Sequence, residues 1–248
     1  MKGTEEPRQS QHPTKAFVAA AGLGKRMQPL TAIKPKPLIE VCGTALIDYG
    51  LDALVRAGTK LAVVNVHYLA DLLEAHVGKR ASPDIIISDE RDELLETGGG
   101  TVKALPHLGS EAFYYLNADS IWIEGAKPNF SHLADSWDNA KMDALLLLSN
   151  ATAAIGYQGN GDFTMNEDGL LQRRPENGSS PYVYASAAIF HPRLFEGAPE
   201  GKFSLNILFD RAISSGRLYG TLMGGAWLHV GTPDAIEAAE TAIAKAAG

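Results

Sequence analysis

A glycine turn and two adjacent cations near the amino end are the residues of this sequence best suited to chemistry. An apolar run at 17–21 ends in small residues, and the turn at 22–24 leads directly to Lys25 and Arg26. Small residues let the main chain approach a ligand, and the amides of such a turn bind phosphate oxygens. The Arg26 guanidinium is a planar fork that matches a phosphate group. We therefore expect this segment to bind a nucleotide polyphosphate through Ala20, Ala21, Gly22, Gly24, Lys25 and Arg26, with Lys25 either an auxiliary cation or a solvated lysine.

The turn differs from the two common phosphate-binding fingerprints. A P-loop would have glycine in place of Ala19 and serine or threonine in place of Arg26. A dinucleotide-binding fingerprint would have its last glycine in place of Met27. An ordinary strand-to-helix turn with surface cations is the remaining alternative. A second cationic segment argues against it, because two flanking prolines hold Lys36 in an extended, pre-positioned backbone.

One aspartate, Asp119, follows an expected strand at 112–116 and is a candidate metal ligand. A carboxylate at the carboxyl end of a parallel strand faces the ligand crevice. Mg²⁺ binds to one or two carboxylates together with phosphate oxygens, so a single well-placed aspartate can hold it. The alternative is a turn aspartate that caps the next segment. The presence of a phosphate-binding turn favours the metal, and we expect Asp119 to bind Mg²⁺.

Three consecutive glycines at 98–100 form a second candidate segment for nucleotide binding. Because they carry no side chains, their backbone can lie flat against a nucleobase. The alternative is a flexible strand-to-helix loop. We expect nucleoside contacts from Thr97, Gly98, Gly99 and Asn117, and a polar contact to substrate from Glu96.

Alternating strand and helix patterns indicate the scaffold that must position these residues. The unbroken apolar run at 16–21 predicts a strand buried on both faces, and apolar residues at helical spacing, such as Ile47, Leu51 and Leu54, predict helices. The expected strands are 16–21, 61–66, 84–88, 112–116 and 143–148, and the expected helices are 46–57 and 69–77. This order predicts βαβ units and an α/β fold with a mostly parallel sheet.

The second half of the chain has a different pattern. Glycines at 156–161, a turn at 166–169 and a long β-prone run at 182–190 predict a small mixed β region beside the first sheet. We expect a flexible polar tail at 1–14 and a single domain at 15–248. Within this domain we expect a nucleotide-binding half at 15–150, a sugar-phosphate-binding half at 151–232 and a C-terminal helix at 233–246.

The composition excludes several classes of protein. The net charge of −7 over 248 residues argues against a general nucleic-acid-binding surface. The single cysteine, Cys42, excludes an internal disulfide. No apolar run reaches the roughly 20 residues that span a bilayer, and the amino end lacks the apolar centre of a signal peptide. We therefore expect a cytoplasmic protein without a membrane or nucleic-acid partner, as a monomer or a small homo-oligomer.

The chain resembles the sugar-1-phosphate nucleotidyltransferases, also called nucleoside-diphosphate-sugar pyrophosphorylases. The resemblance is carried by Ala20-Ala21-Gly22-Leu23-Gly24-Lys25-Arg26-Met27-Gln28-Pro29-Leu30-Thr31, Pro35-Lys36-Pro37-Leu38, Leu95-Glu96-Thr97-Gly98-Gly99-Gly100, Asn117-Ala118-Asp119 and Trp227-Leu228-His229-Val230-Gly231-Thr232. The third of these segments and the compact length are most similar to N-acetylmuramate-1-phosphate uridylyltransferases of cell-wall recycling. Relatives that make GDP-mannose or GDP-heptose share most of the segments.

The resemblance implies a Rossmann-like three-layer sandwich and a reaction that depends on Mg²⁺. A sugar-1-phosphate attacks the α-phosphorus of a nucleoside triphosphate, and pyrophosphate leaves. By resemblance Arg26 binds the leaving phosphates, Lys36 holds the attacking phosphate, and Asp119 completes the catalytic set. The preferred substrates are UTP and N-acetylmuramate-1-phosphate, which give UDP-N-acetylmuramate. The alternatives are a guanylyltransferase for mannose- or heptose-1-phosphate and a catalytically silent regulator that binds a nucleotide sugar.

The second metal ligand and the acceptor pocket are less defined by the sequence. Many members of the family have an aspartate at the position of His229, where it supplies a second ligand, and Mg²⁺ prefers oxygen donors to imidazole. His229 is therefore a candidate ligand, or alternatively a hydrogen-bond partner of a phosphate or of a metal-bound water. For substrate binding we expect Lys36, Glu96, Asp162 and Tyr184, with surface charge and β-core packing as the alternative for the last two.

Overall fold

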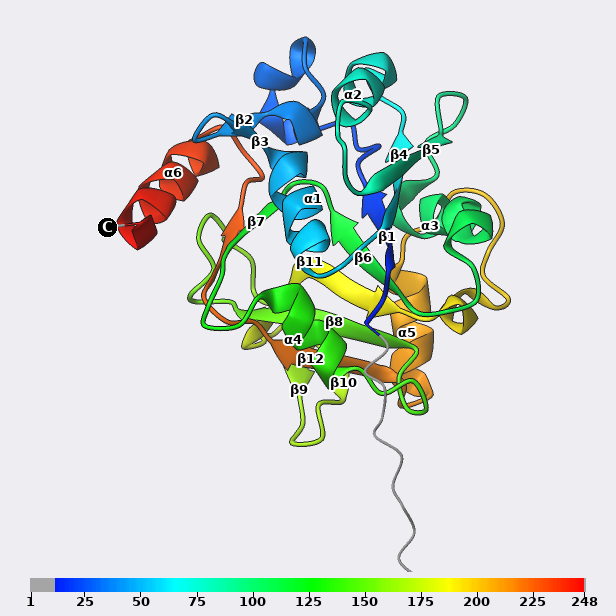
Figure 1. The fold of residues 1–248 in the computed structure, drawn as a ribbon. Helices are drawn as coiled ribbons and strands as arrows, with labels where there is room; N and C mark the ends of the chain where they lie inside the picture. The colour runs from blue at the N-terminus through cyan, green and yellow to red at the C-terminus, as the bar shows by residue number, and fades with distance from the viewer. Residues whose placement is uncertain (1–11, 248) are drawn as a thin grey trace, which may run out of the picture.

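A computed structural model describes residues 12–247, and a nine-stranded sheet runs through its middle (Figure 1). The tail expected at 1–14 lies mostly outside the described residues. Four neighbouring strands of the sheet are parallel, in the order β6-β1-β4-β5. They are β1 (Lys15–Ala19), β4 (Leu61–Val66), β5 (Asp84–Asp89) and β6 (Phe113–Asn117). The predicted parallel α/β core is confirmed, with β1 two residues shorter at its carboxyl end than expected.

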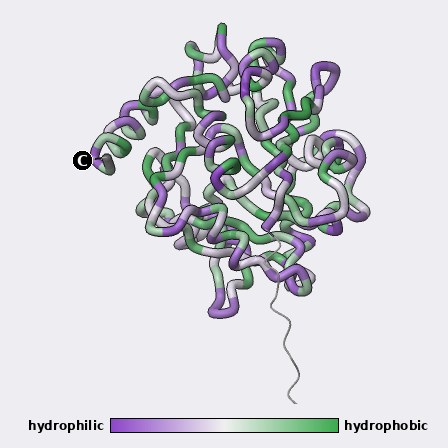
Figure 2. Tube along the Cα trace, in the orientation of Figure 1, coloured by the Kyte–Doolittle hydropathy of each residue, from purple (hydrophilic) through white to green (hydrophobic). Residues whose placement is uncertain are grey.

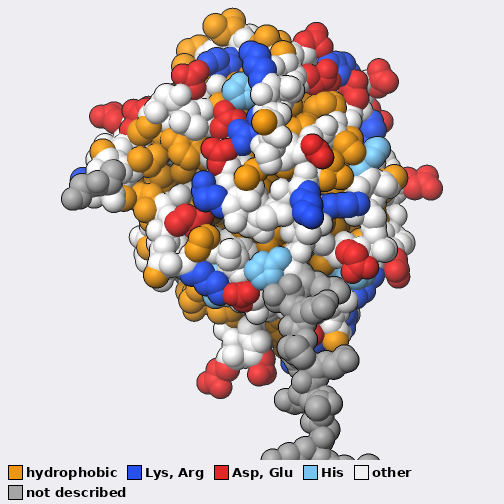
Figure 3. All heavy atoms as spheres, in the orientation of Figure 1, with side chains coloured by type: hydrophobic (Ala, Val, Ile, Leu, Met, Phe, Trp, Pro, Cys, Tyr) orange, Lys and Arg blue, Asp and Glu red, His pale blue; other side chains and the backbone are white. Residues whose placement is uncertain are grey.

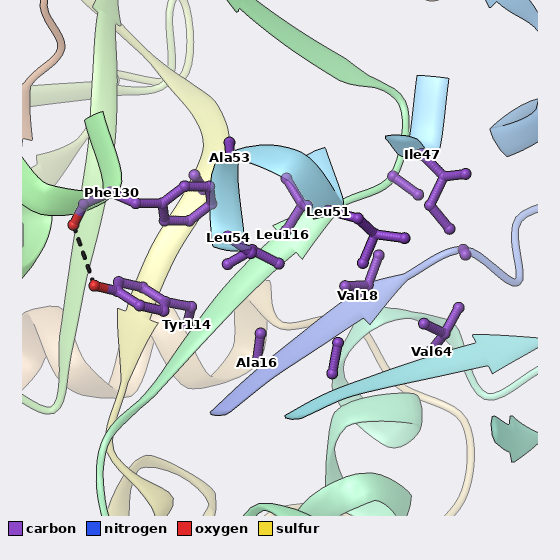
Figure 4. Close-up of a cluster of buried hydrophobic side chains, with 14 of the residues drawn as sticks. Ala16, Val18, Ile47, Leu51, Ala53, Leu54, Val64, Tyr114, Leu116 and Phe130 are labelled. Carbon is purple, nitrogen blue, oxygen red and sulfur yellow. Dashed lines mark hydrogen bonds between the residues drawn. The ribbon is translucent and has the colours of Figure 1, made fainter. Parts of the chain in front are cut away.

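Helices cover both faces of this sheet. Neighbouring residues of each strand point to opposite faces, so an apolar strand needs a packing partner on each side. Val18 belongs to the core under α1 (Leu46–Arg56), α2 (Ala70–Val77) and α4 (Asn129–Ser136). Its neighbour Phe17 belongs to the core under α3 (Glu96–Leu108) and α5 (Asn206–Ser214). Figure 4 shows the first core, in which Leu51 and Leu54 of α1 lie over Leu116 of β6. The fold is thus a three-layer sandwich, as the resemblance implied.

The strands of the second half extend the same sheet rather than forming a separate region. β11 (Tyr182–Phe190) pairs antiparallel with β6 on one side and with β8 (Ala144–Asn150) on the other, and β12 (Leu218–Leu222) pairs with β8. β9 (Phe163–Met165) and β10 (Leu171–Arg173) add a short edge, whose connecting turn is strongly hydrophilic (Figure 2). The small mixed β region expected beside the first sheet is therefore continuous with it, because the apolar β11 pairs with β6 in the central sheet.

A two-stranded ribbon returns the end of the chain to the carboxyl edge of the sheet. β7 (Ser120–Ile123) follows directly after Asp119 and pairs with β13 (Ala226–His229), which places His229 opposite Ser120. The C-terminal helix α6 (Asp234–Ala247) then packs against β13 and against β2 (Glu40–Val41), the partner of β3 (Thr44–Ala45). Four short 3₁₀ helices, η1 (Lys25–Met27), η2 (Leu30–Ala32), η3 (Lys36–Leu38) and η4 (Pro192–Phe195), complete the elements of the described chain.

The glycines at 98–100 lie inside α3, so the loop considered for them is wrong. Gly98 donates its N–H to the Phe203 carbonyl at 2.9 Å, and all three glycines are buried. A Cβ at Gly98 would overlap the Phe203 ring, and one at Gly99 would overlap the Gly201 carbonyl. Glycine is required here because the helix approaches the 201–203 segment too closely for a side chain.

On the face drawn in Figure 3, Lys and Arg side chains are interspersed with Asp and Glu, and neither sign of charge predominates. Within residues 12–247, none of the helices has the length and apolar character needed to cross a membrane.

Gly98→Ala tests the packing of α3. The added methyl group must displace the Phe203 ring, and overpacking of a core costs about 1–3 kcal/mol. We expect a lower free energy of unfolding in denaturant titrations. Gly22→Ala is the control, because a Cβ there meets nothing within 4 Å; equal stability of the two variants would contradict this account of the glycine.

Candidate active site

A cleft of about 430 Å³ opens at the carboxyl ends of β1, β4 and β6. In open α/β sheets, ligands bind at this edge because the strands end there and the following loops diverge. The residues that line the cleft come from four segments: Ala19, Ala20, Ala21 and Gly22; Lys36 and Pro37; Leu94, Glu96 and Thr97; Asn117, Ala118 and Asp119; with Asn65 and Ser204 beside them. Half of the predicted site residues therefore meet in one place.

Gly24 closes the loop that brings Lys36 to the cleft. Its φ of 61° lies in the left-handed region, and a Cβ would stand 2.9 Å from Thr31 Cγ2 and 3.0 Å from Lys36 Cβ. The hydroxyl of the fully buried Thr31 donates to the Gly24 carbonyl at 2.9 Å. The chain from 24 to 36 thus folds back on itself, and a side chain at Gly24 would push the two segments apart.

The backbone amides of the turn divide into two sets. The N–H groups of Ala20 and Ala21 donate to Asn65 Oδ1 at 2.6 and 3.2 Å, so these two residues offer the cleft small side chains rather than donors. Within the described chain, no acceptor pairs with the N–H groups of Gly22, Leu23 and Gly24. Adjacent unpaired amides in a turn bind anions. The donors available to a phosphate thus begin at Gly22, two residues later than the expectation placed them.

Lys36 and Asp119 form an ion pair in the cleft, although 83 positions separate them in the sequence. Lys36 Nζ lies 2.5 Å from Asp119 Oδ2, and the two side chains are 11% and 29% exposed. Pro35 has the expected extended backbone, but Lys36 itself begins η3, so the extended conformation predicted for it is wrong. The pair places a cation and a carboxylate side by side, as a site for phosphate and a metal ion requires.

Arg26 and Lys25 are exposed in η1 and do not line the cleft. Arg26 is nevertheless close enough to act on the site, because its charge and that of Lys36 both help to lower the pKa of His229. Arg26 has no ion-pair partner among residues 12–247. Its guanidinium is therefore free to bind a ligand that extends out of the cleft.

His229 lies beside this group of charges and is neutral near neutral pH. Burial lowers the pKa of its imidazole below 6.5, and the positive charges of Lys36 and Arg26 lower it further against the opposing effect of Asp119. Its ring packs on Trp227, with 5.1 Å between the ring centroids. A neutral imidazole keeps a lone pair available for a metal or a water.

The donor set suits a metal ion that also binds phosphate. No cluster of three or more His, Cys, Asp or Glu side chains occurs among the residues described. Asp119 and His229 therefore supply at most two ligands. Mg²⁺ is commonly held in this way, by one or two protein ligands with phosphate oxygens and waters, whereas a closed structural zinc site would need four.

The opposite wall of the cleft comes from the start of α3. Glu96 has a φ of 61°, which is uncommon for a residue with a side chain, and its carboxylate lies 3.5 Å from Lys202 Nζ. Thr97 Oγ1 accepts from the Leu205 N–H at 3.0 Å. Asn117 Oδ1 accepts from the Tyr115 hydroxyl at 2.9 Å. These contacts hold the wall in place and leave the remaining polar atoms of Glu96, Thr97 and Asn117 for a ligand.

Besides Gly24, Lys25, Arg26 and His229, four more predicted binding residues lie outside the cleft lining. Gly98 and Gly99 face the 201–203 segment. Asp162 accepts from the Tyr184 N–H at 2.9 Å, and the partly buried Tyr184 ring packs on Phe209. The structure places these four residues in packing contacts and not in the lining of this cleft.

Sequence reasoning missed Asn65 and Ser204 in the cleft wall. Asn65 lies near the carboxyl end of a predicted parallel strand, so the rule that identified Asp119 also applied to it. Ser204 carries no such signal, because it comes from a loop far along the sequence.

Residues 15–246 match the nucleotidyl transferase family. This chain belongs to the nucleotidyl transferase family. It is 46% identical over 241 residues to the N-acetylmuramate alpha-1-phosphate uridylyltransferase of Caulobacter vibrioides, covering 96% of this chain and all of that protein. It is 33% identical to the protein of the same name from Neisseria meningitidis serogroup B, covering 88% and 93% of the two chains.

Solved structures show the same fold at low sequence identity. The inositol-1-phosphate CTP transferase from T. maritima is 18% identical, with a TM-score of 0.76 and coverage of 95% of this chain and 96% of that one. A UDP-glucose pyrophosphorylase complexed with UDP-glucose is 16% identical, with a TM-score of 0.76 and coverage of 94% and 99%. The Rossmann-like α/β architecture is therefore that of nucleotidyltransferases.

Lys36→Ala tests the role of the ion pair. The lysine is at the cleft surface, and its loss leaves Asp119 accessible to water, so we expect near-normal stability but a turnover that falls about 10²- to 10³-fold. Pyrophosphate release and thermal unfolding measure the two effects. Lys34→Ala is the matched control, because Lys34 lies in the same loop and pairs with Glu40 outside the cleft. A fully active Lys36→Ala variant would remove this lysine from the site.

Proposed function

We propose that this protein transfers a uridylyl group from UTP to N-acetylmuramate α-1-phosphate, with Mg²⁺ as cofactor and pyrophosphate as the second product. The observation that carries the reaction type is the Lys36–Asp119 pair beside unpaired amides in a cleft at the carboxyl edge of the sheet. The substrates are inferred from the two uridylyltransferases to which the chain is similar along almost its whole length.

The proposed reaction is an in-line displacement at phosphorus. An anionic oxygen of the sugar phosphate forms a bond to the α-phosphorus, and the bond to the bridging oxygen of the β-phosphate breaks. The attacking oxygen is already ionised, so the chain needs no general base. Its task is to bring two polyanions together and to neutralise their charge.

Three groups of this chain perform that task in the proposal. The free amides from Gly22 to Gly24 and the unpaired Arg26 bind the β- and γ-phosphates, which leave as pyrophosphate. Lys36 lies between the phosphate turn and Asp119, where its ammonium group can hold the attacking phosphate against the α-phosphate. Asp119, assisted by His229, would hold Mg²⁺, which neutralises charge on the α-phosphate when it is bound.

The ion pair also gives each of the two charges a partner of opposite sign. Lys36 neutralises Asp119 at 2.5 Å. With both substrates and Mg²⁺ bound, Lys36 would pair with phosphate oxygens, and Asp119 would be available as a ligand of the metal ion. Each group therefore has a charged partner before and after binding, which limits the desolvation cost of either state.

Pyrophosphate release from each pairing of the four common nucleoside triphosphates with several sugar-1-phosphates tests the proposed substrates. We expect UTP with N-acetylmuramate α-1-phosphate to have the highest kcat/KM. Preference for GTP with mannose-1-phosphate would instead favour the guanylyltransferases of this family, such as the Drosophila melanogaster catalytic subunit that is 25% identical over 89% of this chain. Tight binding of a nucleotide sugar without turnover would favour a regulator.

Asp119→Asn tests the proposed metal ligand. An amide is neutral, so the half-saturating Mg²⁺ concentration should rise by at least the roughly 10- to 100-fold typical of losing a group that merely supports a metal ligand. A Mg²⁺ titration of pyrophosphate release measures this rise. Asp210→Asn is the control, since Asp210 is exposed and pairs with Arg173 away from the cleft. An unchanged titration for Asp119→Asn would refute the ligand role.

A further inference from the structure

Two buried polar side chains, Asn65 in the cleft wall and Glu90 outside its lining, lie at the carboxyl ends of neighbouring strands. Asn65 is in β4 and is 3% exposed, and Glu90 follows β5 and is 1% exposed. Neither residue belongs to the charge group of Lys36, Asp119, Arg26 and His229. A buried carboxylate and a buried amide are costly unless their hydrogen bonds are satisfied, so their partners indicate why they are there.

These two side chains form a continuous chain of hydrogen bonds between the two walls of the cleft. Asn65 Oδ1 accepts from the N–H groups of Ala20 and Ala21, at 2.6 and 3.2 Å. Asn65 Nδ2 donates to Glu90 Oε1 at 2.8 Å. Glu90 Oε2 accepts from the Leu95 N–H at 3.0 Å. This series of hydrogen bonds begins immediately before the unpaired amides of the phosphate turn and ends immediately before Glu96 and Thr97 on the opposite wall.

The residue types match their places in this chain. Backbone N–H groups donate at both ends of this series, so each of the two side chains must accept one hydrogen bond from the backbone. One of the two side chains must also donate to the other. An asparagine next to a glutamate meets this requirement, because its amide both accepts and donates whereas a carboxylate only accepts. Two carboxylates at these positions would leave the centre without a donor and would place like charges together in a buried site.

Gly100 is shaped around the same pair. A Cβ on Gly100 would stand 2.6 Å from Glu90 Oε1 and 2.9 Å from Asn65 Nδ2. A side chain here would break the central hydrogen bond, and this gives the third glycine of the triplet a function different from the packing of Gly98 and Gly99. The first turn of α3 is thereby held at a set distance from the end of β1.

We propose that Asn65 and Glu90 are positioning residues for nucleotide binding. They fix the spacing between the phosphate turn and the opposite wall of the cleft at the start of α3. A nucleoside triphosphate must reach both walls at once, so a shift of either wall weakens its binding without touching the acceptor sugar phosphate. The inference rests on the proposed function only in taking a nucleoside triphosphate as the ligand.

The chain contains a matched pair for comparison. Asn129 is 2% exposed, donates from Nδ2 to Glu124 Oε2 at 2.7 Å, and accepts at Oδ1 from the Gly224 N–H at 3.0 Å. It is another buried asparagine bonded to a glutamate and to backbone, but it lies at the start of α4 and not in the cleft lining. A purely structural role would give the two asparagines the same effects.

The experiment compares Asn65→Ala with Asn129→Ala in the full-length protein. UTP binding with Mg²⁺, measured by calorimetry without sugar phosphate, gives the Kd, and pyrophosphate release gives KM for each substrate. We expect both variants to unfold at lower temperature. Only Asn65→Ala should raise the Kd and KM for UTP, by about tenfold or more, with the KM for the sugar phosphate changed less than twofold. Equal UTP affinity in Asn65→Ala and the wild type, or an equal rise in Asn129→Ala, would overturn the proposal.

A charge swap keeps the proposal testable if Asn65→Ala does not fold. Asn65→Asp removes the central donor, and Glu90→Gln in the same chain restores it with the opposite polarity, because glutamine can donate to the new aspartate and still accept from Leu95. The single variant should bind UTP weakly, and the double variant should recover most of the affinity. Failure of the folded double variant to recover UTP affinity beyond the single variant would overturn the proposal.

The calorimetric arm separates this inference from the proposed function. A wild-type protein that binds UTP without pyrophosphate release would refute the transferase while leaving the positioning role measurable. A wild-type protein that binds none of the four nucleoside triphosphates would refute both.

Discussion

The contact between Lys36 and Asp119 is the interaction on which the arrangement of the site depends. The Lys36 side chain is only 11% exposed, so its ammonium group needs a partner of opposite charge, and it pairs at 2.5 Å with Asp119, which remains partly accessible to water. Three features of the fold meet that requirement. The carboxyl end of β6 presents Asp119, the loop folded over Gly24 and Thr31 presents Lys36, and the β7–β13 ribbon brings His229 alongside. Together these features bring charges of both signs to the place where the proposed polyphosphate and Mg²⁺ would bind.

Glycine has two distinct functions around this cleft. At Gly24 it accepts a left-handed backbone and lets Thr31 and Lys36 approach, so that the loop can close. In the 98–100 triplet it removes side chains from a helix that is pressed against the 201–203 segment and against the Asn65–Glu90 pair. A glycine-rich sequence is therefore weak evidence for direct ligand contact. The same residues can serve a ligand indirectly, by letting the walls of its site come close enough together.

The core of the fold was predictable because its signals are local. The unbroken apolar run at 16–21 identified the buried parallel strand β1, and the spacing of Ile47, Leu51 and Leu54 identified α1 within one residue of its observed end. The helix that contains 98–100 was not predictable in this way, because glycine disfavours helix and only its tertiary contacts stabilise one there. The position of β11 in the central sheet was missed for a similar reason: its sequence shows a strand but not which strand it pairs with.

The sequence by itself determined the chemistry of the site and part of its location. The types and order of Gly22 to Arg26, Lys36 and Asp119 indicate phosphate and metal binding, because those functional groups have that chemistry in any fold and because parallel strands present their following residues at one edge. Only the tertiary structure decided which residues meet. It paired Lys36 with Asp119 and brought the charge of Arg26 close enough to affect His229. It also placed Asp162 and Tyr184 outside the cleft lining and linked Asn65 to Glu90. The physical reason is that hydrogen bonds and ion pairs act over a few ångströms in space, whereas the partners are brought that close by strand pairing and packing across long stretches of sequence.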